Sequence, residues 1–453
     1  MTTRKLFAHN FRGWVAPADC FAAFYADNAQ AFWFDRETHA TDRFSVIGDA
    51  DQVTEFTVAA DGVHPLKKAQ SDFDASVDGA EDIELPFDWR PGVVFSLAYD
   101  PDSVSRALTV SRAMVFDHEK RQMWFVGFFA DQKSFDRWYH AALLGLTLTG
   151  GNALGYQFER RNHKLTGPLQ PRHTDAEYLS LIENAKQEIA AGNVYQICLT
   201  NELTASHELD PLNVFYRLRK INPAPYSGFI RVGDFALVST SVEQFLSANR
   251  EGRLQTKPIK GTRARVQPHG AHTGKNQLAS NDEQVVAELA ANVKERAENL
   301  MIVDLMRNDL SKVCQHDTVR VTKLFEVETY ATVHQLVSTI EGQILPELSH
   351  LDAMMAMFPG GSMTGAPKIR ATELISEFER GPRGTYSGLF GYFGHFGHTD
   401  VAMVIRSIVF EGPNLSIGVG GGITSDSDPY FEVAETKLKA RALLAALEVP
   451  DAW

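Results

Sequence analysis

The last third of the chain carries three β-prone runs that follow one another through turns too short to hold a helix. These runs span residues 386–396, 401–410 and 415–419. Strands joined in this way pair antiparallel, because a parallel crossover needs a dozen or more residues. Across the chain, strands are interrupted by helices without a regular alternation of strand and helix. This order predicts an α+β fold.

The remaining elements follow from the spacing of apolar residues. Apolar residues recur at helical spacing from Tyr178 to Ile189, and Gly192 ends that helix. Pro367 suits the first turn of a further helix. The same patterns predict additional strands over residues 42–48, 196–204 and 235–240, and additional helices over residues 282–308, 366–379 and 431–447.

Length and composition limit what the chain can do. With 453 residues, 44% of them hydrophobic, it can bury a core large enough for one big domain or two modest ones. A net charge of −13 without a long basic run argues against nucleic acid or an anionic membrane surface as a partner. The longest uncharged apolar stretch, around residues 141–148, is too short to span a bilayer.

Cysteine usage and the N-terminus predict a cytoplasmic protein. Cys20, Cys198 and Cys314 are odd in number and widely spaced, so they build neither a zinc motif nor a disulfide framework. The first ten residues lead into no apolar core or cleavage site. Two prolines within residues 162–172 mark the expected linker between an N-terminal region and the rest of the chain.

Two glutamate pairs share one helical spacing. Glu295 and Glu298 lie three residues apart in one predicted helix, and Glu432 and Glu435 lie three apart in another. This spacing puts each pair on one helix face, where such pairs are most often solvated. If the two helices converge, four carboxylates in one place need a cation. Oxygen ligands without His or Cys favour Mg²⁺, Ca²⁺ or Mn²⁺ over zinc.

A lysine stands in a turn-forming stretch near the middle of the chain. Lys260 follows Pro258, which fixes φ, and precedes Gly261, which permits a tight bend. By itself such a lysine is most often a solvated loop residue. Held in a desolvating turn, it can lose its proton and act as a nucleophile.

Other polar residues stand in apolar or glycine-rich surroundings. Arg406 lies inside a predicted apolar strand and needs an anionic partner, either a structural carboxylate or a substrate carboxylate. His334 lies in a similar run, where a lone histidine is more often a satisfied core residue than a catalyst. The glycines at 420–422 either let a ligand approach the backbone or form a simple turn. The loop 358–368 leads into a helix whose first amides can hold a carboxylate.

These tracts together resemble the chorismate-binding enzymes over residues 174–447. Each match is modest, and their joint order along the chain is specific. The matching tracts are residues 257–263, 298–309, 331–340, 358–368, 386–388, 401–410, 420–426 and 435–439. Residues 42–48 also resemble an N-terminal stretch of the family.

The resemblance implies a fold and a metal site. The family fold is a large α+β body in which two mostly antiparallel sheets pack face to face, flanked by helices, with the active site in the cleft. Residues 1–165 would form the N-terminal region and residues 173–450 the chorismate-binding catalytic region. The cofactor would be Mg²⁺. Its ligands would be Glu298 and Glu435, supported through water by Glu295 and Glu432.

The resemblance also implies catalytic and substrate-binding residues. Lys260, Glu243 and His334 would be catalytic, with Glu243 as the general acid at the C4 hydroxyl of chorismate. The substrate would be bound by Gln196, Gly261, Thr262, Thr364, Tyr386, Arg406, Gly420, Gly421, Gly422 and Lys439.

Two positions point to one branch of the family. Isochorismate and salicylate synthases carry a water-activating lysine where this chain has Gln196. The position of Lys260 is usually alanine in anthranilate synthases and lysine in component I of aminodeoxychorismate synthases. The resemblance to the latter branch implies a Mg²⁺-dependent transferase that aminates chorismate at C4 through a covalent Lys260 intermediate, for 4-aminobenzoate and folate synthesis. Ammonia would come from a separate glutamine amidotransferase, component II, because no glutaminase constellation is visible in the sequence.

Two alternative functions are considered for a chain with the same tracts. An anthranilate synthase component I would add ammonia at C2 and eliminate pyruvate, and Lys260 argues against it. A noncatalytic regulatory or binding subunit would have lost metal or acid residues, whereas Glu243, Glu298 and Glu435 are all present. Two departures from the family pattern are Val242, where a proline usually stands, and the lack of a clear Leu-Leu-Glu-Ser tract, which marks the tryptophan site of anthranilate synthases.

Overall fold

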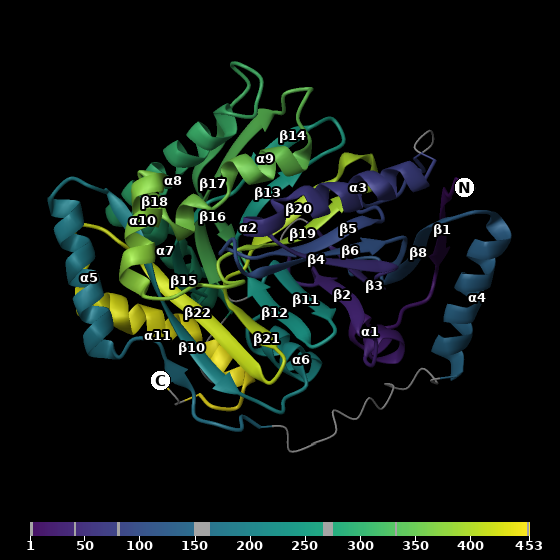
Figure 1. The fold of residues 1–453 in the computed structure, drawn as a ribbon, viewed down its shortest axis with the longest axis horizontal. Helices are drawn as coiled ribbons and strands as arrows, with labels where there is room; N and C mark the ends of the chain where they lie inside the picture. Colours follow the sequence, from purple (N-terminus) through teal and green to yellow (C-terminus); the bar gives the residue numbers. More distant parts are fainter. Residues whose placement is uncertain are drawn as a thin grey trace.

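The strands of the protein form two large sheets (Figure 1). The structure is a computed structural model, and it describes residues 3–39, 42–78, 82–148, 164–265, 275–330, 333–450 and 453. Within the two sheets, every strand pair of the described residues is antiparallel. The predicted α+β class with two antiparallel sheets is therefore confirmed.

One sheet has twelve strands and takes members from both ends of the chain. In sheet order they are β1 (Lys5–Phe11), β8 (Gln122–Phe129), β7 (Arg112–Asp117), β3 (Phe44–Asp49), β2 (Gln30–Asp35), β11 (Tyr226–Val232), β12 (Phe235–Ser241), β21 (Ser407–Glu411), β22 (Asn414–Ile423), β10 (Gln196–Ser206) and β18 (Gly365–Ala366), with β9 (Gln170–Pro171) paired to β10.

The other sheet has ten strands and is mixed in the same way. In sheet order they are β15 (Ile259–Ala264), β17 (Val333–Gln343), β14 (Arg253–Thr256), β13 (Gln244–Ala248), β20 (Thr399–Met403), β19 (Leu389–Gly394), β5 (Gly92–Leu97), β6 (Val104–Val110) and β4 (Gln52–Thr57), with β16 (Arg320–Thr329) paired to β17.

Helices flank the two sheets (Figure 1). They are α1 (Pro17–Tyr25), α2 (Val58–Asp61), α3 (His64–Ser76), α4 (Gln132–Leu148), α5 (Asp175–Ala190), α6 (Pro211–Ile221), α7 (Lys275–Ala291), α8 (Val293–Ser311), α9 (His350–Met357), α10 (Lys368–Glu379) and α11 (Pro429–Ala446), with short 3₁₀ turns at Gly361–Met363 and His395–Gly397. Among the described helices, none combines the length and apolar character needed to cross a membrane.

The two sheets pack face to face through aromatic side chains. Phe34 of β2 and Phe390 of β19 lie with their ring centroids 6.4 Å apart. Gly228 of β11 faces the same ring, and a Cβ at this position would come within 2.6 Å of Phe390. A residue without a side chain is therefore needed where the sheets approach most closely.

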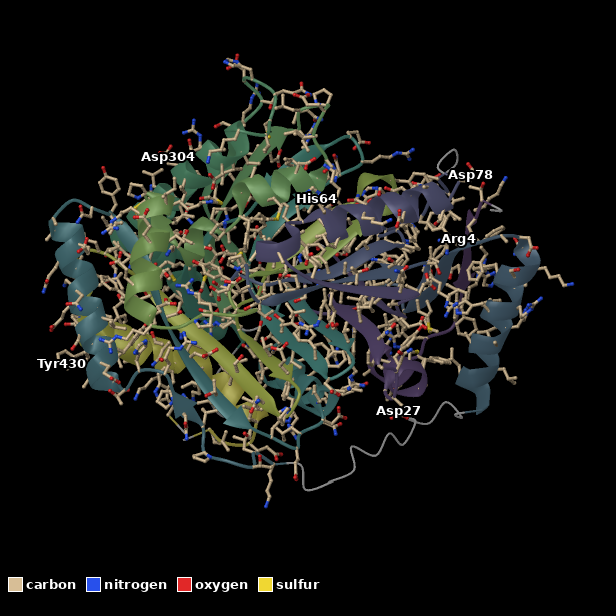
Figure 2. All side chains as sticks on the ribbon, in the orientation of Figure 1. Arg4, Asp27, His64, Asp78, Asp304 and Tyr430 are labelled. Atoms are coloured by element: carbon tan, nitrogen blue, oxygen red, sulfur yellow. The ribbon has the colours of Figure 1, made fainter. Side chains whose placement is uncertain are left out.

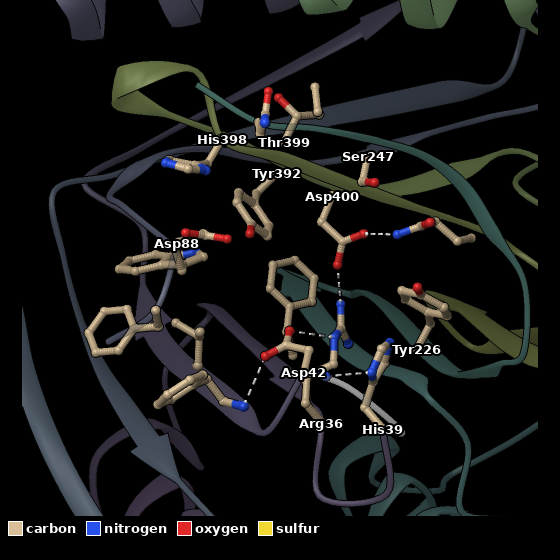
Figure 3. A pocket seen from close by; sticks show the side chains of 18 of the residues that line it. Arg36, His39, Asp42, Asp88, Tyr226, Ser247, Tyr392, His398, Thr399 and Asp400 are labelled. Atoms are coloured by element: carbon tan, nitrogen blue, oxygen red, sulfur yellow. Dashed lines mark hydrogen bonds and ion pairs between the residues drawn. The ribbon is translucent and has the colours of Figure 1, made fainter. Parts of the chain in front are cut away.

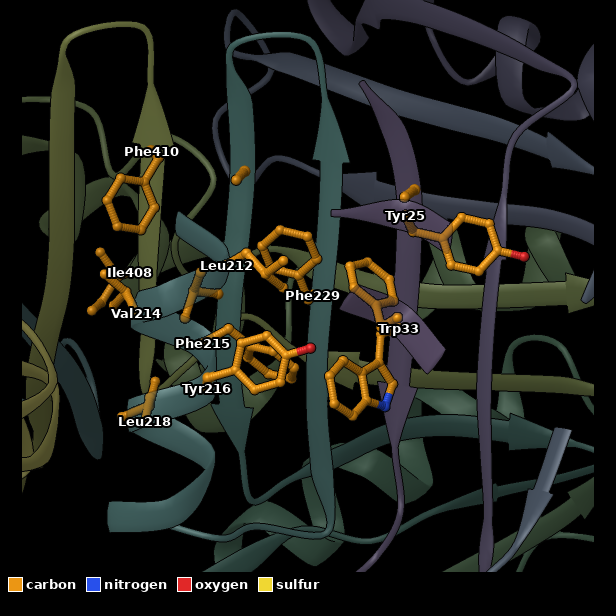
Figure 4. Close-up of a cluster of buried hydrophobic side chains, with 14 of the residues drawn as sticks. Tyr25, Trp33, Leu212, Val214, Phe215, Tyr216, Leu218, Phe229, Ile408 and Phe410 are labelled. Carbon is orange, nitrogen blue, oxygen red and sulfur yellow. The ribbon is translucent and has the colours of Figure 1, made fainter. Parts of the chain in front are cut away.

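The outer face of the twelve-stranded sheet is covered by helices. Trp33 alternates with its neighbours in β2 and points to this face, where its ring lies 5.5 Å from Phe21 of α1 and 5.2 Å from Phe215 of α6. Figure 4 shows Trp33, Phe215 and Phe229 in this cluster. β2 is buried on both faces, which explains why its sequence is apolar without alternation.

Residues 401–410, predicted as one strand of a meander, form two strands in different sheets. β20 ends at Met403 in the ten-stranded sheet, and β21 begins at Ser407 in the twelve-stranded sheet. The chain turns between them at Arg406, whose φ of 52° lies in the left-handed region. The prediction of a continuous strand was wrong because buried segments on both sides of the turn read as one apolar run.

The helix predicted over residues 282–308 is also interrupted. α7 ends at Ala291 and α8 begins at Val293, with Asn292 between them. The Asn292 side chain accepts a hydrogen bond from the backbone N–H of Glu295 and so caps α8. Pro367, predicted inside the first turn of α10, is the residue that precedes that turn.

Strands from the first 165 residues are hydrogen-bonded to strands from the rest of the chain. β2 pairs with β11, and β5 pairs with β19. The regions 1–165 and 173–450 therefore contribute to the same two sheets. The cleft residues described next come from both sheets and from the helices at their ends.

Candidate active site

Lys260 lies where the two sheets meet. It belongs to β15 of the ten-stranded sheet, and its side chain is 13% exposed. A Cβ placed on Gly422 of β22 would lie 3.1 Å from the Lys260 Nζ and 2.8 Å from the Gln196 Nε2. The predicted lysine, glutamine and glycine thus come together from strands of two sheets. Gly422 leaves the space that the lysine and glutamine side chains fill.

Gln196 is buried without hydrogen-bond partners. The residue is fully buried, and neither its amide oxygen nor its amide nitrogen has a partner among the described residues. An unpaired buried amide costs roughly 1–3 kcal/mol for each group left unsatisfied. Such a cost is sustained where a ligand completes the hydrogen bonds, so the Gln196 amide is placed to bind a polar group beside Lys260.

Two of the four predicted metal-binding glutamates lie near the start of α8 and two lie on α11. Each forms an ion pair with a lysine or arginine side chain. Lys260 Nζ lies 3.9 Å from Glu298. Lys439 Nζ lies 2.8 Å from Glu435. The remaining pairs are Arg263 with Glu295 at 3.4 Å and Lys294 with Glu432 at 4.0 Å.

Burial perturbs the pKa values of three of these carboxylates. It raises the pKa of Glu298 against the opposing charges of Lys260 and Lys294, and the nearby Glu295 and Glu432 add to the rise. Burial and the neighbouring Glu435 likewise raise the pKa of Glu432. Burial also opposes ionisation of Glu435, but Lys439 with the other nearby lysines outweighs it, and the pKa of Glu435 is lowered.

The donor set fits a hard divalent cation, although the carboxylates are not gathered into a finished site. In the part of the chain that the structure describes, no three His, Cys, Asp or Glu side chains are grouped closely enough to hold a metal ion. Lysine ammonium groups stand among the carboxylates instead. The predicted Mg²⁺ site therefore stays a prediction, supported by its all-oxygen donors.

Glu243 is a buried carboxyl between β12 and β13. Burial raises its pKa to about 7, while a hydrogen bond from Ser362 and the charge of Lys260 act in the opposite direction. A carboxyl group with a pKa near neutrality can hold a proton and give it up at physiological pH. Glu243 is thus suited to the predicted role of general acid. Ser362, in the 358–368 loop, is a partner that sequence reasoning did not assign.

The raised pKa of Glu243 predicts a pH-dependent stability. The folded protein holds this proton up to about pH 7, whereas the unfolded chain releases it near the ordinary value of 4.5. Stability is therefore lost as pH rises through this window. Gln at this position cannot ionise. The free energy of unfolding of Glu243→Gln, relative to that of the wild type, should therefore rise by on the order of 3 kcal/mol from pH 5 to pH 8. Urea unfolding at both pH values measures this, and a pH-independent difference would contradict it.

Arg406 is a partly buried cation without a carboxylate partner among the described ion pairs. Burial lowers its pKa, although Tyr386 and Glu435 favour its charge. Its Nη1 donates a hydrogen bond to the backbone carbonyl of Lys439 at 3.1 Å. A partly buried guanidinium with donors to spare can bind a carboxylate in two-pronged fashion. Arg406 and the buried Tyr386 are therefore placed to bind an anionic group.

The glycines at 420–422 border the same region. A Cβ on Gly420 would lie 2.1 Å from the carbonyl oxygen of Leu199, so only glycine fits between β22 and β10. A Cβ on Gly421 would lie 3.2 Å from a carboxylate oxygen of Glu432 and 3.5 Å from the Lys439 Nζ. Lys439 also donates a hydrogen bond to the Gly420 carbonyl at 2.8 Å. Gly421 and Lys439 thus adjoin the carboxylate cluster.

The remaining predicted residues frame the cleft. A Cβ on Gly261, whose φ is 80°, would lie 3.0 Å from the Glu295 carboxyl carbon. Thr262 accepts a hydrogen bond from Gln335 at 3.4 Å. Thr364 is buried, and its hydroxyl donates to the Gly360 carbonyl at 3.0 Å.

Both ring nitrogens of His334 have hydrogen-bonding partners. Its Nε2 lies 2.9 Å from Asp282, and its Nδ1 lies 2.9 Å from the Thr329 hydroxyl. The residue pairs with Arg263 across β15 and β17. With both ring nitrogens engaged, His334 supports the strand that carries Lys260. Its predicted catalytic role stays a prediction.

A cavity of about 510 Å³ lies between the sheets and was not anticipated from the sequence (Figure 3). Arg36, which directly follows β2, lines it and is paired with Asp400 at 3.0 Å and Asp42 at 3.7 Å. Burial raises the pKa of Asp42 to about 6 despite Arg36. Burial and Arg36 lower the pKa of His39 to about 3. Lys260 is not among the residues that line this cavity.

Sequence comparisons connect the chain to proteins of known name. The family described as chorismate binding enzyme matches residues 29–445. A relative from Streptomyces griseus, named aminodeoxychorismate synthase, is 40% identical over 382 residues, which cover 81% of this chain and 51% of that protein. A relative from Salmonella typhimurium, named aminodeoxychorismate synthase component 1, is 33% identical over 440 residues, or 90% of this chain and 91% of that protein. The chain spans about half the length of the Streptomyces relatives it matches.

A structural comparison agrees with the sequence comparisons. The crystal structure of anthranilate synthase component I from Streptococcus pneumoniae superposes with a TM-score of 0.72 at 27% identity. The match covers 89% of this chain and 92% of that chain. The two-sheet architecture is therefore shared with a solved structure.

Proposed function

This chain belongs to the chorismate binding enzymes, and we propose that it aminates chorismate at C4 to give 4-amino-4-deoxychorismate, a precursor of 4-aminobenzoate and folate. The observation that carries the proposal is the position of Lys260. Its ammonium lies in the cleft between the sheets, beside Gln196 and Glu298, with the neutral acid Glu243 within electrostatic reach. A nucleophile and an acid with raised pKa in one cleft are what two successive allylic displacements require.

The reaction then follows from these two groups. Deprotonated Lys260 attacks C2 of chorismate, both conjugated ring double bonds shift, and the C4 hydroxyl takes the proton of Glu243 and leaves as water. Ammonia attacks C4, both double bonds shift back, the C2–N bond to Lys260 breaks, and the new C4 ammonium returns a proton to Glu243. The detour through the lysine adduct places nitrogen on the carbon that carried the hydroxyl.

The other cleft residues hold the substrate. Arg406 and Tyr386, with the amides of Gly420–Gly422, are assigned to the enolpyruvyl carboxylate, because they offer a partly buried cation and close backbone approach. Mg²⁺ would be held by Glu298 and Glu435, with Glu295 and Glu432 in support, and would supply positive charge for the ring carboxylate. The Gln196 amide is assigned to a polar group of the substrate near C2.

The proposed ammonia source is a separate glutamine amidotransferase. The Salmonella relative carries the name component 1, whereas the Streptomyces relatives are about twice the length that this chain matches. A two-component arrangement here would leave ammonia production to another chain. The proposed transferase activity and the proposed cytoplasmic location both rest on the assignment of this chain as the component that aminates chorismate.

An assay of the isolated chain tests the proposed function. With chorismate, Mg²⁺ and an ammonium salt at raised pH, the product should be 4-amino-4-deoxychorismate, identified by mass and ultraviolet spectrum. Glutamine in place of ammonium should give no product, because no glutaminase residues are assigned in this chain. Adding a matching amidotransferase should restore turnover with glutamine. Anthranilate as the main product would support the C2-aminating alternative, and no product of either kind would support a noncatalytic subunit.

A further inference from the structure

Lys294 lies between carboxylates of two different helices. Its Nζ is 3.9 Å from Glu298, one turn further along α8, and 4.0 Å from Glu432 on α11. Both carboxylates are mostly buried, with side-chain exposures of 14% and 6%, whereas the lysine is 47% exposed. Figure 2 shows the two helices, with Asp304 labelled on α8 and Tyr430 at the start of α11. One movable cation thus connects two nearly buried anions.

The stability of α8 does not explain a lysine at this position. Lys294 is in the first turn of the helix, where the helix dipole disfavours positive charge. The i, i+4 pair with Glu298 runs from lysine to glutamate, which is the weaker orientation on a helix. The position of Lys294 instead allows its ion pair with Glu432 on α11.

The other lysines of the cluster are placed differently. Among the described ion pairs, Lys260 takes part in one, with Glu298, and its side chain is 13% exposed. Lys439 pairs with Glu435 on its own helix and donates to the Gly420 carbonyl. Among the described ion pairs of this cluster, the one between Lys294 and Glu432 joins α8 to α11. Lys294 is thus the lysine of this cluster whose described ion pairs reach glutamates of both helices.

We propose that the Lys294 ammonium, which lies between Glu298 and Glu432, neutralises the carboxylate cluster in the metal-free protein, and that the divalent cation held by the cluster displaces it on binding. The inference rests on the proposed metal site. An ammonium between the two carboxylates offsets a repulsion that would otherwise destabilise the cluster. Because the lysine is half exposed on a flexible four-carbon stem, it can turn to solvent and keep its charge hydrated. The lysine therefore competes with the metal and lowers its affinity.

Binding of Mn²⁺ alone to Lys294→Met tests the competition. Free Mn²⁺ is measured by electron paramagnetic resonance, so the readout needs neither chorismate nor turnover. We expect Mn²⁺ to bind about tenfold more tightly to the variant, because one nearby positive charge no longer opposes it. The melting temperature of the metal-free variant should fall below that of the wild type, and saturating Mn²⁺ should remove the difference.

Lys437→Met is the matched control. Lys437 lies on α11 and pairs with Asp175 at 2.7 Å, so this variant removes the same charge from the same region without touching the two glutamates. Its Mn²⁺ affinity should match that of the wild type. Equal tightening in both lysine variants would overturn the proposal, because charge at a distance would then suffice.

The remaining outcomes are also decisive. Unchanged or weaker Mn²⁺ binding in Lys294→Met would show that the lysine does not compete with the metal. Lys294→Gln repeats the measurement if the methionine variant is poorly folded by circular dichroism. If neither the wild type nor Glu298→Gln binds Mn²⁺ and the two are indistinguishable, the metal site itself is wrong. If instead Mn²⁺ binds equally to the wild type and to Lys294→Met, only the proposed role of Lys294 is overturned.

Discussion

Replacing Lys260 with alanine is expected to lower the rate of C4 amination by at least about a thousandfold, because the covalent adduct with chorismate cannot form without the lysine. The variant should still bind chorismate, since Arg406, Tyr386 and the glutamates are unchanged. It should also fold, because Lys260 lies at the cleft and contributes one ion pair at 3.9 Å. Turnover with ammonium and a binding titration with chorismate together separate the two effects.

The covalent intermediate gives a second readout for the same residue. Without ammonia, wild-type protein incubated with chorismate should form an adduct on Lys260 that mass spectrometry locates after digestion. Lys257→Ala is the matched control, because Lys257 belongs to the same tract but pairs with Glu328. It should keep the adduct and the activity. If wild-type protein makes aminodeoxychorismate without an adduct on Lys260, the proposed mechanism is wrong.

Replacing Glu298 with glutamine is expected to abolish most activity while leaving the fold intact. The change keeps the shape of the side chain but removes a charge that the proposed Mg²⁺ needs. Because burial and neighbouring carboxylates already raise the pKa of Glu298, losing this charge relieves repulsion and should not destabilise the protein. We expect a loss of about a hundredfold or more in kcat/KM, with an unchanged or higher melting temperature.

Metal removal provides the companion measurement. Activity should vanish with EDTA and return when Mg²⁺ is added in excess. Glu435→Gln should behave like Glu298→Gln. Glu373→Gln is the control, since Glu373 is an exposed helix residue paired with Arg370 away from the cleft. Full activity in Glu298→Gln, or activity that EDTA leaves untouched, would remove the metal assignment.

Local sequence patterns were enough to identify the class of the fold and the family. Helical spacing placed Glu295 with Glu298, and Glu432 with Glu435, on single helix faces, and the structure has both pairs on helices. The short turns predicted antiparallel pairing, and the described strand pairs agree. These features depend on residues a few positions apart, which is the range over which backbone geometry repeats.

Local sequence patterns did not predict the contacts between segments that are distant in the chain. The turn at Arg406 carries the chain from one sheet to the other, yet residues 401–410 are apolar on both sides of it. Asn292 divides a predicted helix because its side chain caps α8. Lys294 could have been noticed from its i, i+4 spacing to Glu298, but its second partner lies 138 positions further along the chain on α11.

The chemistry of the cleft depends on that tertiary arrangement. The sequence alone identified Lys260, Gln196 and Gly422 as separate residues on predicted strands and turns. Their meeting, the unpaired amide of Gln196 and the raised pKa of Glu243 arise only when two sheets bury them together. Burial removes water from polar groups, and the neighbours that replace it come from anywhere in the chain. Residue types and their local spacing are therefore written in the sequence, whereas the partners and the desolvation of these residues are properties of the folded chain.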